Sequence, residues 1–265
     1  MSRRLITMIK NSSKDLSDNK RFLLDTMKAI ELTANENRRK GSNWYKPSSL
    51  HCMRNMYFTR VGAEQDSTPT EYNSQGMADT GTDRHERIQN ALMNLKRFGF
   101  DWEYMDVEEY VNKKQNEGKC LTLVVKGKQG AETLLFDTAL KISFRCDGIL
   151  RKISTNEYFL FEFKNVISFK YAQVENKPLA QHHEQVICYC TALDLDKAFV
   201  LYENRDTCYL ECPCVFNVNQ EMKNKLCDYI YECEGYVERL IAPPKTNDTK
   251  NCRWCPFKSI CKKVG

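Results

Sequence analysis

The sequence predicts an α/β fold with a mixed central β-sheet flanked by helices, and three observations point to it. Segments with helical spacing are interleaved with short segments of alternating apolar residues, in the order helix, strands, helix, strands, helix. The clearest alternation covers residues 142–164 and predicts a β-hairpin. The chain has 265 residues with no internal repeat and no low-complexity linker, which fits one domain with elaborations.

Helical spacing in the first hundred residues predicts three helices. The first covers residues 20–40 and ends in a polar, basic run. The second begins at Lys46-Pro47-Ser48-Ser49, with either serine as its N-cap, and carries Cys52. Residues 64–80 are polar and predict a loop, or else the beginning of the next helix. The third helix covers residues 81–97, with His85 near its N-terminal end.

Strands are predicted around the hairpin, and helices after it. Residues 103–111 and 121–125 have strand character, 127–130 predict a turn, and 133–140 lead toward the hairpin. Residues 179–193 predict a helix after Pro178, and 198–202 and 208–210 predict two short strands. Residues 218–240 form a long amphipathic pattern that Pro243-Pro244 ends.

The second half of the hairpin places two opposite charges on one face of an apolar strand. Residues two apart share a face, so Glu162 and Lys164 project together, opposite Phe159, Phe161 and Phe163. Burying such a pair is costly unless that face opens onto a site. Asp147, at the end of the partner strand, reaches the same place. The alternative is a surface salt bridge between Glu162 and Lys164.

The composition limits which ligands and which cell compartment we expect for the chain. The net charge of +5 permits a local basic groove for nucleic acid without requiring one. The sequence contains no apolar run long enough for a signal peptide or a membrane span, so we expect a cytoplasmic protein. In that compartment the 13 cysteines are expected to be mostly small buried residues, with a subset acting as metal ligands.

That subset is predicted at the C-terminal end, in the spacing Cys252-x2-Cys255-Pro256-x4-Cys261. Two thiolates three residues apart can bind one metal or cluster, and the third closes the same loop. Cys52 is our choice for the fourth ligand. On physical grounds a tetrahedral zinc fits four thiolates equally well. The other nine cysteines are expected to pack, although the pair Cys212 and Cys214 has no clear assignment.

Taken together, these signals resemble the PD-(D/E)XK nuclease superfamily, and most of all its RecB-like iron–sulfur branch of CRISPR-adaptation and AddB-type nucleases. The resemblance extends from Cys52 to Cys261 and follows the family's order. It rests on Cys52, His85 in GTDRHERI, Asp147 in RCDGIL, Glu162-x-Lys164, and Gln185-x3-Tyr189 before the terminal cysteines. The chain departs from the family in lacking a proline before Asp147 and in carrying an added segment, Cys120–Leu140.

The resemblance implies a restriction-endonuclease-like core whose N- and C-terminal ends are joined by a [4Fe–4S] cluster. It assigns that cluster to Cys52, Cys252, Cys255 and Cys261. Carboxylates such as Asp147 and Glu162 suit Mg²⁺ or Mn²⁺, and the resemblance adds His85 and the backbone carbonyl of Phe163 as ligands. Lys164 would orient or deprotonate the attacking water. Gln185 and Tyr189, four residues apart on a helix, would position Lys164 or the nucleic acid, and His182 would join them.

Each of these residues also has a structural interpretation. His85 can bond Asp83 or cap its helix, and Tyr189 can be a core residue with a hydrogen-bonded hydroxyl. Gln185 and Lys164 can be solvated polar positions.

The function expected is that of a metal-dependent deoxyribonuclease, an exonuclease on single-stranded DNA ends with a structural cluster. Such an enzyme would suit CRISPR adaptation or phage recombination in a bacterial or phage-infected cell, as a homo-oligomer or with partner proteins. Two alternatives remain. One is a non-catalytic nucleic-acid-binding protein whose four cysteines hold zinc, and the other is a structure-specific or RNA-directed endonuclease.

The single nuclease domain, 1–265, would divide into a helical region (1–100), a catalytic core (101–216) and a helix with the cluster-binding tail (217–265). Trp254 can stack on a base, and basic side chains can contact phosphates, among them Arg54, Arg60, Arg84, Arg87, Lys258, Lys262 and Lys263.

Overall fold

A mixed six-stranded β-sheet forms the centre of the protein. The computed structural model describes residues 18–36, 42–66, 71–129, 132–247 and 249–264. In the central sheet β5 pairs antiparallel with β1 and β6, β6 pairs parallel with β7, and β7 pairs antiparallel with β8 and β9. The strands are β1 (Trp102–Met105), β5 (Gly148–Lys152), β6 (Glu157–Val166), β7 (Lys197–Asn204), β8 (Leu210–Glu211) and β9 (Val215–Asn217).

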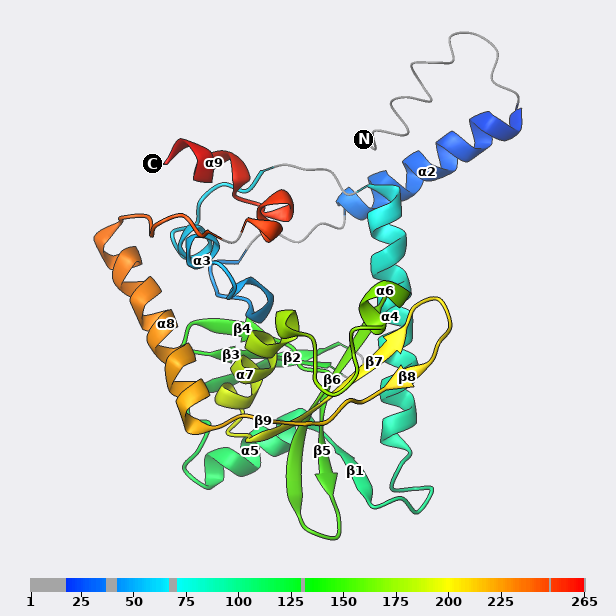
Figure 1. Ribbon diagram of the computed structural model, residues 1–265, viewed down its shortest axis with the longest axis vertical. Coiled ribbons are helices and arrows are strands. Elements are labelled where there is room, and N and C mark those ends of the chain that lie inside the picture. The colour runs from blue at the N-terminus through cyan, green and yellow to red at the C-terminus, as the bar shows by residue number, and fades with distance from the viewer. Residues whose placement is uncertain (1–17, 37–41, 67–70, 130–131, 248, 265) are drawn as a thin grey trace.

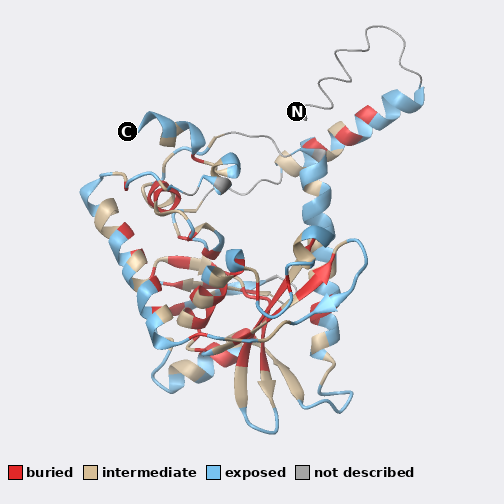
Figure 2. Cartoon of the chain, viewed as in Figure 1, coloured by how far each residue is buried: buried red, intermediate tan, exposed pale blue. Residues whose placement is uncertain are grey.

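Helices cover both faces of this sheet (Figure 1). On one side α4 (Tyr72–Met93) packs Ile88 against Leu150 and the three phenylalanines of β6. On the other side α7 (His183–Ala192) packs on β6 and β7, and α8 (Gln220–Arg239) packs on α7. Buried residues are therefore concentrated in the central strands (Figure 2). The predicted mixed α/β architecture with flanking helices is confirmed.

The remaining helices are short or lie outside these layers. Of them, α3 packs on α8 and α2 packs on α4. Their bounds are α2 (Asp18–Glu36), η1 (Pro47–Ser49), α3 (Met53–Arg60), α5 (Val107–Asn116), α6 (Ser168–Tyr171), η2 (Ala180–His182), η3 (Lys250–Trp254) and α9 (Lys258–Lys263). None of the helices described combines the length and the apolar character needed to cross a bilayer.

A second sheet of three strands lies beside the first, and it changes the predicted hairpin. It contains β2 (Leu123–Gln129), β3 (Glu132–Asp137) and β4 (Ile142–Phe144). The prediction that residues 142–146 form the strand next to Tyr158–Lys164 is wrong, because β4 pairs with β3 and the partner of β6 is β5. The chain passes from one sheet to the other across residues 145–147. Asp147 therefore lies at the junction of the two sheets, directly before β5.

Gly148 allows this passage. Its φ of 158° lies at the edge of the region that side chains rarely adopt, and a Cβ added there would lie 2.4 Å from the ring of Tyr104. Because the Tyr104 ring can lie this close to Gly148, its hydroxyl donates a hydrogen bond to the backbone oxygen of Asp147 at 2.7 Å.

The strand predicted over residues 103–111 is wrong beyond Met105. Residues 107–116 form α5, because Asp106 caps the helix by accepting hydrogen bonds from the amides of Glu108 and Glu109. The apolar residues Val107, Tyr110 and Val111 have the i, i+3, i+4 spacing of one helical face, and all three are buried.

Several predicted boundaries move. The helix predicted over residues 20–40 corresponds to α2, which begins at Asp18 and is described as far as Glu36. Residues 37–40 lie outside the described part. The helix predicted over 81–97 begins at Tyr72 and ends at Met93, so His85 lies well inside it and the N-terminal placement is wrong. The N-cap of α3 is Cys52, not Ser48 or Ser49. Gly127 lies in β2 at a bulge, so the turn predicted from it is wrong there, and residues 130–131 lie outside the described part.

Candidate metal and nuclease site

The imidazole of His85 lies against Asp147. Nδ1 of His85 is 3.1 Å from Oδ1 of Asp147, and its ring packs edge-on to Phe163 with centroids 4.9 Å apart. Burial alone would lower the pKa of His85, but the hydrogen bond with Asp147 and the charges of Asp147 and Glu162 raise it above its ordinary value. The helix α4 and the sheet junction thus bring together two of the residues that the sequence singled out.

Asp147 is held on three sides. Its Oδ2 accepts a hydrogen bond from the backbone amide of Phe163 at 2.6 Å, which joins it to β6. Its backbone oxygen accepts from Gln89 Nε2 at 2.9 Å as well as from Tyr104. Because Gln89 lies one turn after His85 on α4, the same helix that presents the imidazole also fixes the backbone that presents the carboxylate.

On the next strand, a chain of hydrogen bonds runs from Glu162 to Tyr189. Lys164 Nζ donates to Glu162 Oε1 at 2.6 Å and to Gln185 Oε1 at 2.8 Å. Gln185 Nε2 donates in turn to the hydroxyl of Tyr189 at 2.7 Å. The predicted placement of Gln185 and Tyr189 on one helix face next to Lys164 is therefore what the structure has. His182 hydrogen-bonds to another group, with Nδ1 2.8 Å from the Tyr202 hydroxyl, but it lies near enough to Lys164 that burial and then the Lys164 charge lower its pKa.

Glu162 is buried, with only 3 % of its surface exposed. Burial raises its pKa to about 8, the charge of Asp147 adds to the rise, and Lys164 opposes it. Its Oε2 has no hydrogen-bond partner among the described residues. Lys164 does contact Glu162, but a carboxyl group this deeply buried is not part of a surface salt bridge.

Glu132, at the start of β3, is the residue that the sequence did not single out. One of its carboxylate oxygens, a ring nitrogen of His85 and a carboxylate oxygen of Asp147 all lie within 4.8 Å of one another. Burial raises the pKa of Glu132, and the charge of Asp147 adds to this. Nothing in the local pattern marks Glu132, since it comes near the other two only because the second sheet folds back to the junction.

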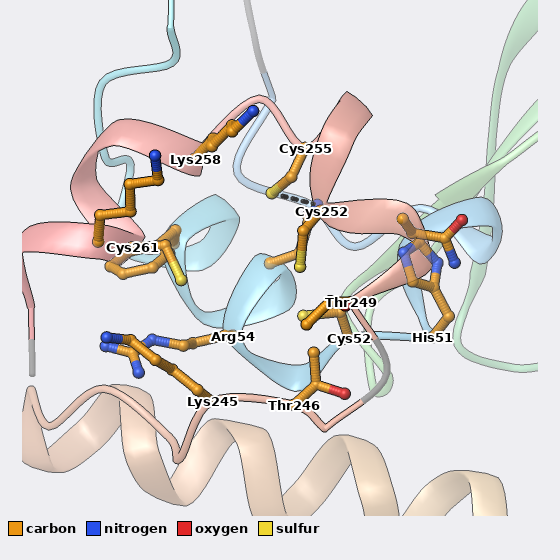
Figure 3. A pocket seen from close by; sticks show the side chains of 14 residues that line it. His51, Cys52, Arg54, Lys245, Thr246, Thr249, Cys252, Cys255, Lys258 and Cys261 are labelled. Atoms are coloured by element: carbon orange, nitrogen blue, oxygen red, sulfur yellow. Dashed lines mark hydrogen bonds between the residues drawn. The ribbon is translucent and has the colours of Figure 1, made fainter.

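The four predicted cluster ligands line one pocket of about 270 Å³. Figure 3 shows the side chains of Cys52, Cys252, Cys255 and Cys261 around it, contributed by the start of α3 and by the η3–α9 tail. Asn55 Nδ2 lies 3.6 Å from the sulfur of Cys255. Four thiols around a cavity much larger than a single ion fit a multinuclear cluster in donor type and in room.

Hydrogen bonds also join the tail to the N-terminal region. The amide of Asp66 donates to the Pro256 oxygen at 2.7 Å, and the Asp66 carboxylate accepts from the amide of Ser259 at 3.1 Å. Arg54 Nη2 donates to the backbone oxygen of Val264. The two ends that the cysteines were predicted to connect therefore also meet through protein contacts.

The remaining cysteines and basic residues range from buried to exposed, and Cys120, Cys214 and Cys227 are half-buried. Cys146, Cys188, Cys190 and Cys233 are buried, as expected for packing residues, whereas Cys208 and Cys212 are exposed. Arg54 is buried, so the expectation that it contacts phosphates is wrong. Arg60 pairs with Glu234, and Arg84 and Arg87 both pair with the fully buried Glu203. Trp254 is 76 % exposed.

Comparison with known proteins gives a distant structural likeness. No protein-family model matches the chain, and no curated protein does. A solved structure described as "Crystal structure of SSO0001" shares 16% sequence identity with the chain, at a TM-score of 0.47. The match covers 92% of this chain and 98% of that one.

Proposed function

We propose that the protein is a Mg²⁺- or Mn²⁺-dependent deoxyribonuclease that acts as an exonuclease on single-stranded DNA ends. One observation carries the proposal: the His85 imidazole touches Asp147 at the sheet junction, and Asp147 is bonded to the strand that carries Glu162 and Lys164. Metal ligands beside a fixed ammonium group can supply the charge stabilisation and the nucleophile that phosphodiester hydrolysis requires.

The donor set suits a divalent cation. His85, Asp147 and Glu162 offer one imidazole nitrogen and carboxylate oxygens, and the carbonyl of Phe163 would add a backbone oxygen. The buried Oε2 of Glu162, which lacks a hydrogen-bond partner among the described residues, is an acceptor that a cation would satisfy. An imidazole in the set favours Mn²⁺ over Mg²⁺. Such an ion, when bound, offsets charge on the phosphoryl oxygens and allows water to act as the nucleophile at neutral pH.

The residues around Lys164 do the positioning. Lys164 is fixed between Glu162 and Gln185, so its ammonium group can orient the attacking water and offset the negative charge of the transition state. Tyr189 accepts the second hydrogen bond of the Gln185 amide, and its own ring lies 5.2 Å from that of Phe144. Gln185 is therefore held so that its oxygen faces Lys164.

We also propose that the cysteine pocket binds a [4Fe–4S] cluster with a structural role. The cluster would add a second connection between α3 and the tail, which Asp66 and Arg54 already join. The exposed Trp254 and the lysines of α9 lie on the same tail and would contact single-stranded DNA by stacking and by charge. Colour tests the assignment, because a protein with this cluster, purified without oxygen, is brown and a zinc protein is colourless.

The decisive experiment is digestion of end-labelled single-stranded DNA with Mn²⁺. Lys164→Ala and Glu162→Gln should each lower the rate by about 100-fold or more, since they remove a transition-state charge and a ligand. The matched control is the ion pair of Lys197 and Glu157 between β6 and β7, and Lys197→Ala and Glu157→Gln should cleave within twofold of the unaltered protein. Full activity in both site variants would refute the site. Closed circular single-stranded DNA should stay intact, and its cleavage would indicate an endonuclease.

A further inference from the structure

The added segment Cys120–Leu140 contains the β2–β3 hairpin, which brings one carboxylate to the sheet junction. Glu132 is the first residue of β3 and pairs with Gln129 across the hairpin. Its oxygen, the His85 nitrogen and the Asp147 oxygen fit within a 4.8 Å span. Ligand atoms around one divalent ion lie about 3 Å from one another at metal–ligand distances of about 2.0–2.2 Å, so small side-chain movements close this group around an ion.

The surroundings of Glu132 do not balance its charge. Its cationic neighbours are the His85 imidazole and Arg145, whose Nε lies 4.0 Å from Oε2, at the outer limit of an ion pair. The carboxylate of Asp147, which lies beside that of Glu132, carries charge of the same sign. Two carboxylates that share one imidazole and a distant guanidinium are only partly compensated, and a bound divalent ion would complete the compensation.

An independent observation at the same junction also calls for a cation. The Glu162 residue is 3 % exposed, and its Oε2 has no hydrogen-bond partner among the described residues. Asp147 thus has one acidic neighbour on β3 and another on β6. A buried acceptor without a partner near a second carboxylate, that of Asp147, is the environment of a metal ligand.

We propose that Glu132 is a further side-chain ligand of the divalent ion, supplied by the added hairpin, and this rests on the metal site of the proposed function. The ion would then be held by side chains from α4, from the sheet junction and from the second sheet, together with Glu162 of β6. The hairpin is in this view a functional element and one wall of the catalytic centre.

The test measures Mn²⁺ binding to the full chain by calorimetry in metal-free buffer, apart from any cleavage. Glu132→Gln keeps the shape and removes the charge, and it should weaken Mn²⁺ binding about tenfold or more. Glu132→Asp keeps the charge on a shorter side chain and should bind with intermediate affinity. Glu103→Gln, in a part-buried carboxylate on β1 that pairs with Lys96 and Arg151, is the control and should bind within twofold of the unaltered chain.

The outcomes separate this proposal from the proposed function. Unchanged Mn²⁺ affinity in Glu132→Gln, with DNA still cut by the unaltered chain, overturns the role of Glu132 and leaves the nuclease standing. Mn²⁺ binding that depends on Glu132 in a chain that cuts no DNA supports the ligand and overturns the nuclease. A loss of thermal stability without metal, at unchanged affinity, would assign Glu132 to the ion pair with Arg145 and overturn the proposal.

Discussion

The buried carboxylate of Glu162 has a consequence for stability in the absence of metal. Because its pKa is raised to about 8 in the folded chain, the folded state holds a proton that the unfolded state has already released at neutral pH. The free energy of unfolding should therefore fall as pH rises from about 4 to about 8. Denaturant unfolding with a chelator present measures it.

Glu162→Gln should flatten that part of the pH profile, since the amide does not titrate. The control is Glu157→Gln, on the same strand as Glu162. Because Lys197 lowers the pKa of Glu157, this replacement should change the profile only in acid, where the exposed pair titrates. A profile that keeps its full slope in Glu162→Gln would contradict the assignment.

The ion pairs of Glu203 allow a second prediction at the scale of single residues. It is fully buried at the end of β7 and accepts from Arg84 and Arg87, which flank His85 on α4. Glu203→Gln should lower the free energy of unfolding by about 1–3 kcal/mol, because two arginines lose their partner while remaining partly solvated. Thermal and urea unfolding measure this. A matched replacement at the exposed Glu211 should have little effect, and equal losses at both positions would contradict a specific role for Glu203.

Among the elements, α5 offers the clearest test of a cap. Asp106 Oδ1 accepts from the amides of Glu108 and Glu109 at 2.9 and 3.1 Å. Asp106→Ala should cost about 1 kcal/mol of unfolding free energy, whereas Asp106→Asn should retain most of it because asparagine caps equally well. Chemical unfolding of both variants measures the difference, and equal losses would show that the contact of Asp106 with Lys128 matters more than the cap.

The elements also show which patterns were readable from the sequence. The alternation in residues 157–166 predicts β6 and its two faces, because that strand is buried by helices on both sides and each face has its own partners. Residues 107–111 do not alternate, and their apolar positions Val107, Tyr110 and Val111 have the spacing of one helical face. The cap residue Asp106 was the signal that could have decided between a strand and a helix.

At the scale of the whole molecule, the candidate site depends on contacts that no local pattern contains. His85, Asp147, Glu162 and Lys164 were predicted from motifs whose order along the chain is informative. Glu132 was not, because its position depends on how the second sheet meets the first. The passage across residues 145–147 likewise depends on the ring of Tyr104 lying against Gly148, a contact between residues 44 positions apart.

The cysteines of the C-terminal tail, residues 252–261, allow a prediction at the same scale. Cys255→Ala should lose the brown colour and lower the melting temperature, because it would remove the proposed cluster that would join Cys52, the N-cap of α3, to residues 252–261. Absorbance and thermal unfolding of protein purified without oxygen measure the two effects. Cys212→Ala removes an exposed cysteine outside the pocket and should change neither. A stable, brown Cys255→Ala protein would contradict the ligand assignment.

The helix α4 is anchored to the sheet through only one half. Residues 84–89 hold every contact with β5, β6 and β7 described above, whereas most side chains over residues 73–83 are exposed and the helix there extends away from the sheet beside α2 (Figure 1). Backbone amides in the anchored half should therefore exchange with deuterium far more slowly than those in the projecting half. The gradient along this single helix would mark where local fraying ends and global unfolding begins, with His85 close to the boundary.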